Sequence, residues 1–244
     1  MTTPQQALVR SAARNNAEWC AAMCRAHGVA EEFGREAWVA AGRTPAYYPE
    51  AVTLAPGADR NALVAGIDTT SPGASVKDSF ADLDLTGAGF RVLFDARWIH
   101  RPAGAAAPHT AEEASGLSWD VVGDPDALRA WALAWADGGE DAGLFRAGLL
   151  ADPGTYVLSG RPARGGRVVA GAVVTRSGQA VGVSNVFARD GHEPDAAWSA
   201  LPHVLGRLFP TLAVVGYEHG DDLAAALRHG FEQVGPLRVW LHEG

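Results

Sequence analysis

The sequence is poor in cysteine and in lysine, and its low cysteine content restricts the chemistry open to it. Its 244 residues include two cysteines, Cys20 and Cys24, and one lysine, Lys77. Two thiols are too few for a disulfide framework or a tetrahedral zinc site. The eight histidines contain no pair with a zinc-binding spacing and a nearby carboxylate, so we expect no metal site. The cysteines lie four residues apart on a predicted helix, and we expect them to be small core residues in a reducing cytosol.

Long apolar runs are also missing. No stretch reaches the length of about 20 residues that a membrane-spanning helix requires, so we expect no membrane partner. The first six residues lack the basic and apolar regions of a signal peptide. With 48% hydrophobic and 20% charged residues, the composition is that of an ordinary globular protein. We therefore expect a cytoplasmic protein.

Basic residues are fewer than acidic ones, 20 against 28, and the net charge is −8. Proteins that bind nucleic acids gather lysine and arginine to neutralise phosphates. We therefore expect neither DNA nor RNA as a partner.

The pattern of the chain predicts two lobes. Residues 102–116 contain prolines and small residues without helical or strand periodicity, and we interpret them as a linker. The first lobe, 1–101, begins with a helix predicted over 4–27 and closes with an alternating strand over 89–99. The second lobe, 117–244, is more regular.

The last third of the chain alternates strands and helices. Glycine and acidic residues mark where several of these elements begin and end. The predicted elements are strands over 168–174 and 180–188, a helix with Trp198, Leu201 and Leu205 on one face, a strand over 212–217, a helix that ends at Gly230-Phe231, and a strand over 237–242.

The two lobes share a short sequence repeat. Gly89-Phe90 is followed by Arg97-Trp98-Ile99-His100, and Gly230-Phe231 is followed by Val239-Trp240-Leu241-His242 at almost equal spacing. The repeat favours two lobes related by duplication, and a chance match of two short motifs is the alternative.

The order of elements in residues 117–244, with a helix ending in Gly230-Phe231 before a final strand, resembles the acetyl-CoA-dependent N-acyltransferases of the GNAT superfamily. The resemblance implies an α+β fold, or three-layer α/β/α, with a mixed sheet of about six or seven strands in this lobe. It also implies that the smaller N-terminal lobe is a related or degenerate α/β unit, as in tandem acyltransferases whose first lobe has lost its cofactor site.

The resemblance implies an acetyl-CoA site at the end of the strand over 180–188. In the superfamily, the pantetheine arm pairs with exposed backbone of this strand, and the pyrophosphate rests on N–H groups at the start of the next helix. The matching residues are Val186, Phe187 and Ala188 for pantetheine, with Arg189 and Gly191 for the pyrophosphate.

The pyrophosphate loop departs from the superfamily pattern, and this departure counts against acetyl-CoA as the co-substrate. The spacing after Arg189 is wrong, and no second small residue is in register with Gly191. Asp190, Glu193 and Asp195 place carboxylates where a pyrophosphate would approach. Each such contact at about 4 Å and a dielectric of about 20 opposes binding by up to ~4 kcal/mol before screening. For Asp195, an ordinary helix cap is the alternative.

The general acid that the superfamily often uses is a tyrosine four residues before the glycine, and that position is Ala226. Tyr217 or Glu218, at the end of the strand over 212–217, could transfer the proton instead. The alternative is that Tyr217 packs in the fold and Glu218 is solvated.

The first lobe contains polar residues that could form a wall of the acceptor site. These are Tyr47 and Tyr48 between two prolines, and Lys77 beside Asp78. A solvated turn is the alternative for Lys77, and packing against the first helix is the alternative for the tyrosines.

Two functions follow from the resemblance. The first is an N-acyltransferase acting on a small amine by direct attack on the thioester, with a homodimer as a possible assembly. The second is a non-catalytic GNAT-like protein that binds a metabolite or a protein partner in the old cleft. The altered loop and Ala226 favour the second, and the predicted fold favours the first.

Overall fold

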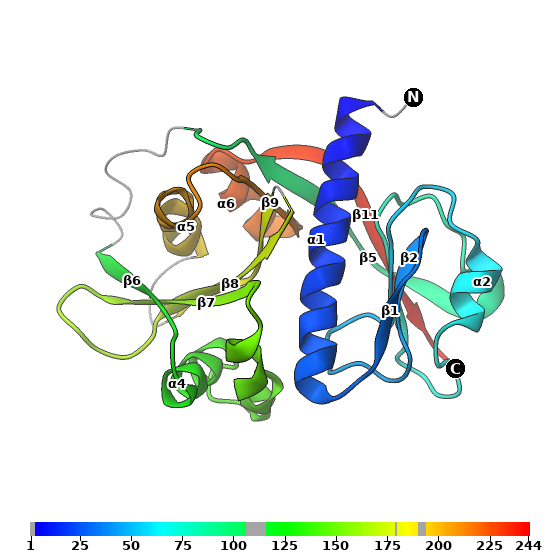
Figure 1. The fold of residues 1–244 in the computed structure, drawn as a ribbon, viewed down its shortest axis with the longest axis horizontal. Helices are drawn as coiled ribbons and strands as arrows, with labels where there is room; N and C mark the ends of the chain where they lie inside the picture. Colours follow the sequence, from blue (N-terminus) through cyan, green and yellow to red (C-terminus); the bar gives the residue numbers. More distant parts are fainter. Residues whose placement is uncertain (1–2, 106–115, 179, 190–193) are drawn as a thin grey trace. The chain divides into compact units, whose positions relative to one another are not determined.

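The computed structural model describes residues 3–105, 116–178, 180–189 and 194–244. The chain forms two compact units (Figure 1). Unit 1 comprises Met1–Trp98 and Val234–Gly244, and unit 2 comprises Ile99–Gln233.

The units differ from the predicted lobes, 1–101 and 117–244, at the C-terminal end of the chain. Residues 234–244 follow the second predicted lobe in sequence, yet they group with unit 1. Most of the predicted linker, residues 106–115, lies outside the described residues.

Unit 1 is a sheet with a long helix and two short ones. Its strand order is β1-β2-β3-β4-β11-β5, with β3 and β4 parallel and β11 antiparallel to β4. The elements are α1 (Pro4–His27), β1 (Glu31–Phe33), β2 (Ala37–Ala40), β3 (Ala51–Thr53), α2 (Arg60–Ala65), β4 (Ser75–Asp78), η1 (Thr86–Ala88), β5 (Phe90–Arg101) and β11 (Glu232–His242).

Local sequence explains both ends of α1, and the predicted helix over 4–27 is confirmed. Thr3 and Gln6 form a reciprocal capping box at its start, and Gly28 ends it in the left-handed conformation with φ 73°. None of the described helices is both long and apolar enough to cross a membrane.

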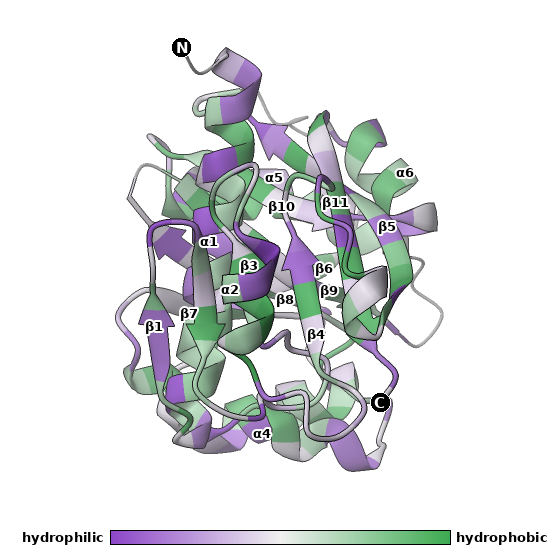
Figure 2. Cartoon of the chain, turned by 90° about the vertical axis from the view of Figure 1, so that its right-hand side faces the viewer, coloured by the Kyte–Doolittle hydropathy of each residue, from purple (hydrophilic) through white to green (hydrophobic). Residues whose placement is uncertain are grey.

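The edge strand β1 is mostly hydrophilic, as Figure 2 shows, because it carries Glu31 and Glu32. Charges on an edge strand oppose pairing with another chain. The sequence therefore protects this edge of the unit 1 sheet against aggregation.

Unit 2 is a mixed sheet with helices on both faces. Its strand order is β10-β9-β8-β7-β6, antiparallel except for the parallel pair β9 and β10. The elements are β6 (Leu117–Val121), α4 (Pro125–Trp135), η2 (Glu140–Leu144), η3 (Ala147–Ala151), β7 (Thr155–Pro162), β8 (Ala170–Ser177), β9 (Ala180–Ala188), α5 (Pro194–Leu208), β10 (Ala213–Glu218) and α6 (Gly220–Arg228).

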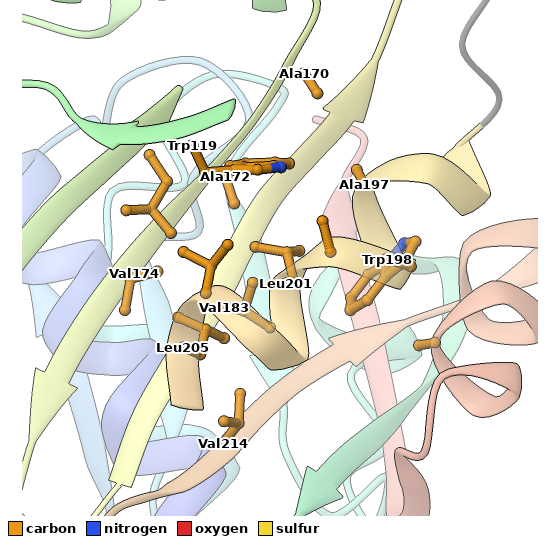
Figure 3. Close-up of a cluster of buried hydrophobic side chains, with 14 of the residues drawn as sticks. Trp119, Ala170, Ala172, Val174, Val183, Ala197, Trp198, Leu201, Leu205 and Val214 are labelled. Atoms are coloured by element: carbon orange, nitrogen blue, oxygen red, sulfur yellow. The ribbon is translucent and has the colours of Figure 1, made fainter. Parts of the chain in front are cut away.

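Figure 1 shows α4 on one face of the unit 2 sheet, and α5 and α6 on the other. The face under α5 holds a large apolar core (Figure 3). The predicted helical stripe is confirmed there, because Trp198, Leu201 and Leu205 are all at most 1% exposed. Burial of each such side chain contributes about 2 kcal/mol, so the core fixes α5 over β8 and β9.

The predicted repeat corresponds to similar local structure. Gly89 and Gly230 both have positive φ, 82° and 86°, and each precedes a long strand, β5 or β11. Phe90 and Phe231, which follow these glycines, are each 3% exposed. In addition, each unit contains a parallel pair, β3 with β4 in unit 1 and β9 with β10 in unit 2. These likenesses favour duplication over a chance match.

Candidate functional site

The parallel ladder between β9 and β10 ends before either strand does. The prediction that these two strands are neighbours is confirmed. The register runs through three pairs and ends at Val215↔Gly182. Both strands nevertheless continue, β9 to Ala188 and β10 to Glu218. A Cβ on Gly216 would lie 3.0 Å from the carbonyl oxygen of Val183, so the strands are still close at that point. We call the segments after it, 184–188 and 217–218, the open end.

A β-bulge lies in β9 within the open end. Gly171 pairs with Phe187 and Val173 with Ser184, so two residues of β9, Asn185 and Val186, oppose Ala172 alone. Asn185 has a positive φ of 52°, which asparagine tolerates better than most residues. Sequence reasoning missed this bulge, and its one signal was a polar asparagine inside an apolar strand.

The bulge changes which residues of β9 face α5. Before it, Val181 and Val183 belong to the core under α5. After it, Val186 and Ala188 pack against the same core. Phe187 points to the other face, where its ring meets the ring of Trp131 from α4 at 5.3 Å. The side chains of the predicted pantetheine-binding residues are therefore divided between the two faces.

The backbone of β9 also has two edges. The N–H of Arg189 donates to the carbonyl of Val169 at 2.7 Å, on the β8 side. Because successive residues of an antiparallel strand direct their backbone groups to opposite edges, those of Ala188 point away from β8. This edge lies toward β10, where the ladder has already ended, so Ala188 suits the pairing with pantetheine that the resemblance implies.

The side chain of Arg189 does not point toward α5. Its Nη2 donates to the carbonyl of Trp135 at 2.9 Å and its Nε to that of Ala134 at 3.4 Å. These are C-terminal carbonyls of α4, which Arg189 therefore caps. Gly191, also predicted to bind pyrophosphate, lies outside the described residues, as do Asp190 and Glu193.

The first turn of α5 contains Asp195, whose carboxylate lies beside Arg228 and His229. Arg228 Nη2 lies 2.7 Å from Oδ1, and His229 Nε2 lies 3.1 Å from Oδ2 without the alignment of a hydrogen bond. Burial raises the pKa of Asp195, but the interactions with Arg228 and His229 outweigh this and hold its pKa below the usual range. The start of α5 thus offers helix N–H groups beside a carboxylate whose charge is largely compensated.

Trp198 fills part of the space between α5 and α6. Its ring packs edge-on against Phe231 at 5.5 Å, and its Nε1 donates to Asp222 in the first turn of α6 at 3.2 Å. Phe187, by contrast, points toward α4.

The predicted proton-transfer residues lie at the end of β10 on opposite faces. Val214 belongs to the core under α5, so alternation places Glu218 on that face and Tyr217 on the face of α4. Both side chains are half-buried. Ala226, where the superfamily often has a tyrosine, is fully buried in the core.

The predicted acceptor wall belongs to unit 1, and most of it is buried. Lys77 is 6% exposed and its Nζ donates to Asn16 Oδ1 of α1 at 3.0 Å. A solvated turn, the alternative for Lys77, is therefore wrong, because the residue lies in β4. The ring of Tyr48 packs edge-on against that of Trp19 of α1 at 5.7 Å, so the alternative of packing against the first helix is confirmed for this residue. Tyr47, in contrast, is 71% exposed.

Asp78, the remaining residue of that wall, organises a turn. It is fully buried and accepts the backbone N–H of Leu83 at 3.0 Å. Burial raises its pKa above the usual value, although backbone N–H groups that donate to the carboxylate, that of Leu83 among them, act in the opposite direction. Among the described residues, no group of three or more histidine, cysteine, aspartate or glutamate side chains could hold a metal ion.

Comparisons with known proteins find likeness in structure and none in sequence. No protein-family model and no curated protein matches the chain. A GCN5-related N-acetyltransferase from Kribbella flavida is similar in structure with a TM-score of 0.61 at 16% identity, covering 96% of each chain. A GCN5-related N-acetyltransferase from Sphaerobacter thermophilus has a TM-score of 0.54 at 12% identity, covering 96% of this chain and 93% of its own.

A GCN5-related N-acetyltransferase-like protein from Streptococcus suis covers 96% of this chain and 98% of its own, with a TM-score of 0.50 at 15% identity. All three likenesses extend over both units. The chain therefore has a GNAT-like fold, as the resemblance predicted, and the likeness extends beyond residues 117–244, on which the resemblance was based.

Proposed function

We propose that this protein is an acyl-CoA-dependent N-acyltransferase that transfers an acetyl group to a small amine. The observation that carries the proposal is the open end of the β9–β10 pair. There the ladder stops at Val215↔Gly182 while both strands continue, and a bulge at Asn185 interrupts the neighbouring ladder. Within the GNAT fold, this is the place where a thioester arm could pair with backbone.

The described residues fit acyl-CoA at two points. The backbone groups of Ala188 that point away from β8 could pair with the pantetheine arm. The N–H groups at the start of α5 could hold the pyrophosphate, as helix N-termini commonly do. Asp195 opposes this, but Arg228 Nη2 at 2.7 Å offsets its charge. When bound, acyl-CoA supplies a thioester whose carbonyl carbon accepts the amine nitrogen as the carbon–sulfur bond breaks.

Tyr217 is the better placed of the two predicted proton-transfer residues. It lies on the face of the sheet opposite α5, so it could meet an amine that approaches from the side opposite the nucleotide. Its phenol could give a proton to the leaving sulfur, while the amine loses its proton directly or through water. Glu218 would then lie on the face of α5, which is the side of the sheet proposed to bind the nucleotide.

Two measurements test the proposal. Isothermal titration of the full chain with acetyl-CoA should give saturable binding, and no heat at millimolar ligand would contradict it. Release of free thiol with a panel of small amines then tests transfer. Tyr217→Phe should lower kcat by about 10²-fold or more with little change in KM, because general acid catalysis typically contributes that much.

Tyr156→Phe is the matched control. Tyr156 lies on β7, where its ring packs edge-on against Phe209 at 5.2 Å. It should leave kcat unchanged. If Tyr217→Phe also left kcat unchanged, Tyr217 would have no catalytic role.

A second function has its own support. Trp198 lies between α5 and the first turn of α6, and Asp195 joins the start of α5 to the end of α6. Together with Ala226, these contacts favour a non-catalytic protein that binds a metabolite or a partner. This alternative predicts no binding of acetyl-CoA by the natural chain and restored binding in Trp198→Ala.

A further inference from the structure

A cavity of about 330 Å³ lies within unit 1, between α2 and η1. It is lined by four residues of α2, between Arg60 and Ala65, and by four residues between Asp84 and Ala88. We call it the α2 pocket. All of its lining residues belong to unit 1. The volume lies within the range of about 300 to 1,000 Å³ that is typical of small-molecule sites.

The core of unit 1 fixes the two walls of the α2 pocket. Leu63 of α2 and Leu85 before η1 are 4% and 1% exposed, and both belong to the same apolar core. Val64 and Ala88 pack against that core and also line the pocket. The pocket therefore has an apolar surface that an aliphatic group of a ligand would cover.

Two exposed side chains of opposite charge line the same pocket, Arg60 in the first turn of α2 and Asp84 before η1. In the part of the chain that the structure describes, neither side chain forms an ion pair. Hydrogen bonds from Thr86 hold the pKa of Asp84 below its usual value, and the charge of Arg60 acts in the same direction. The two charges therefore act on each other without direct contact.

Both charged side chains keep hydrogen-bonding capacity for a ligand. Asp84 Oδ1 accepts the backbone N–H of Thr86 at 3.0 Å and its hydroxyl at 2.6 Å, whereas Oδ2 accepts no hydrogen bond from a described residue. Among the described residues, the guanidinium of Arg60 likewise has no acceptor, so its forked donors remain available. The N–H groups at the start of α2 play no part, because the side chain of Asp59 already accepts two of them.

We propose that the α2 pocket binds an α-amino acid with an aliphatic side chain, such as leucine. One carbon atom of this ligand carries both a carboxylate and an ammonium group, so a site for it needs a cation and an anion beside an apolar surface. Arg60 would hold the carboxylate through its forked donors, and Asp84 Oδ2 would accept from the ammonium group. A simple anion would be opposed by Asp84, and a simple cation would be opposed by Arg60.

The site is independent of acyl transfer, since it lies within unit 1 and needs neither the open end nor acetyl-CoA. An ammonium group held by Asp84 keeps its proton and has no lone pair with which to attack a thioester. The amino acid is therefore a ligand of the α2 pocket and not the acceptor of an acyl group there.

The test is a titration of the ¹⁵N-labelled full chain with L-leucine, followed by two-dimensional NMR. Saturable shifts should appear at the amides of Asn61, Gly87 and Ala88, with millimolar affinity because both charged side chains are exposed. Three ligands that each lack one group are titrated in parallel: 4-methylpentanoate without the ammonium group, 3-methylbutylamine without the carboxylate, and glycine without the side chain. Each should bind at least about threefold more weakly than leucine.

Two variants separate the two charges. Arg60→Gln should weaken the binding of leucine at least about threefold without weakening that of 3-methylbutylamine. Asp84→Asn keeps an oxygen for the turn at Thr86, and it should weaken the binding of leucine to the same extent without weakening that of 4-methylpentanoate. Arg35→Gln is the matched control, since Arg35 is an exposed arginine between β1 and β2 that does not line the pocket.

Three outcomes would overturn the proposal. The first is the lack of saturable shifts with leucine at tens of millimolar, or shifts that avoid α2 and η1. The second is leucine binding that Arg60→Gln and Asp84→Asn leave unchanged, with circular dichroism confirming that both variants are folded. The third is equal affinity for leucine and for 4-methylpentanoate or 3-methylbutylamine, which would show that the pocket reads only one charge.

Discussion

Replacing Asp195 by asparagine should strengthen the binding of acetyl-CoA. The carboxylate lies in the first turn of α5, where the pyrophosphate is proposed to rest, and it engages Arg228 at 2.7 Å and His229 at 3.1 Å. The amide side chain of Asp195→Asn would keep the shape and a hydrogen-bonding oxygen while removing the negative charge. Arg228 would then be available to the incoming phosphates.

The magnitude follows from Coulomb's law. A carboxylate about 6.5 Å from a phosphate, at an effective dielectric of about 40, opposes binding by roughly 1.3 kcal/mol, which is about a tenfold change in affinity. The stability cost should stay below about 1 kcal/mol, because the side chains of Asp195 and Arg228 are 44% and 59% exposed. The gain should shrink in 1 M salt, where the Debye length is about 3 Å.

The assay is isothermal titration at low and high salt on the natural chain, Asp195→Asn and Arg228→Ala. Arg228→Ala should bind more weakly than the natural chain, because it leaves Asp195 uncompensated. If both variants bind acetyl-CoA as the natural chain does, the nucleotide does not lie at the start of α5. If Asp195→Asn binds more weakly, the carboxylate serves as a cap that the site needs.

The ion pair also has a pH dependence with a definite sign. The pKa of Asp195 is lowered in the folded state, so its contribution to stability is present above the unfolded value of about 3.9. That contribution is lost as pH falls through the lowered pKa. The free energies of unfolding in urea of Asp195→Asn and the natural chain should therefore differ at pH 6, and the difference should shrink as the pH falls below the unfolded value.

Two further predictions concern packing and the thiols. Gly171→Ala should lower the free energy of unfolding in urea by about 3 kcal/mol, because a Cβ there would overlap the ring of Trp131 and lie 2.5 Å from Cε1 of Phe187. Gly123→Ala is the control. A Cβ on Gly123 would have nothing within 4 Å, so this change should cost less than about 1 kcal/mol. Equal costs would show that the rings yield easily. Burial raises the pKa of Cys24 to about 12 and raises that of Cys20 as well, so neither thiol should react with Ellman's reagent at pH 8 until guanidinium unfolds the chain. Rapid reaction of the folded protein would contradict the burial of both.

Local sequence predicted the elements whose signals are local. Thr3, Gln6 and Gly28 mark both ends of α1 within a few residues, and the apolar stripe with Trp198 marks the buried face of α5. The order of strands and helices was enough to identify the GNAT fold. These features depend on spacing within one element or on the order of elements along the chain.

Contacts between distant residues could not be predicted in this way. Lys77 and Asn16 are 61 positions apart, and the charge of Lys77 suggested a surface turn until its partner on α1 was known. Arg189 matched a phosphate motif by position, but the one-residue bulge at Asn185 sets the face of every residue after it and directs Arg189 to α4. No pattern in the sequence brings Asp195 to Arg228 and His229.

The final strand is the clearest case, because β11 belongs to unit 1 although it follows unit 2 in sequence. Residues Arg238 to Leu241 pair with β4, and Trp240 lies in the core of unit 1 with Val76 and Phe90. Trp240→Ala should therefore cost about 3 to 5 kcal/mol and speed amide exchange in β4.

Trp131→Ala is the matched control in unit 2. Trp131 is fully buried and its Nε1 donates to the carbonyl of Leu158 at 2.8 Å. Its loss should speed exchange in β7 and β8 and leave β4 protected, because those strands carry its contacts. If Trp240→Ala instead loosened β8 and β9 and spared β4, the last strand would belong with the residues that precede it in sequence. If each variant loosened both units equally, the chain would unfold as one cooperative body. The expected result is two separate patterns of exchange, because side-chain packing, and not position along the chain, decides which unit a strand stabilises.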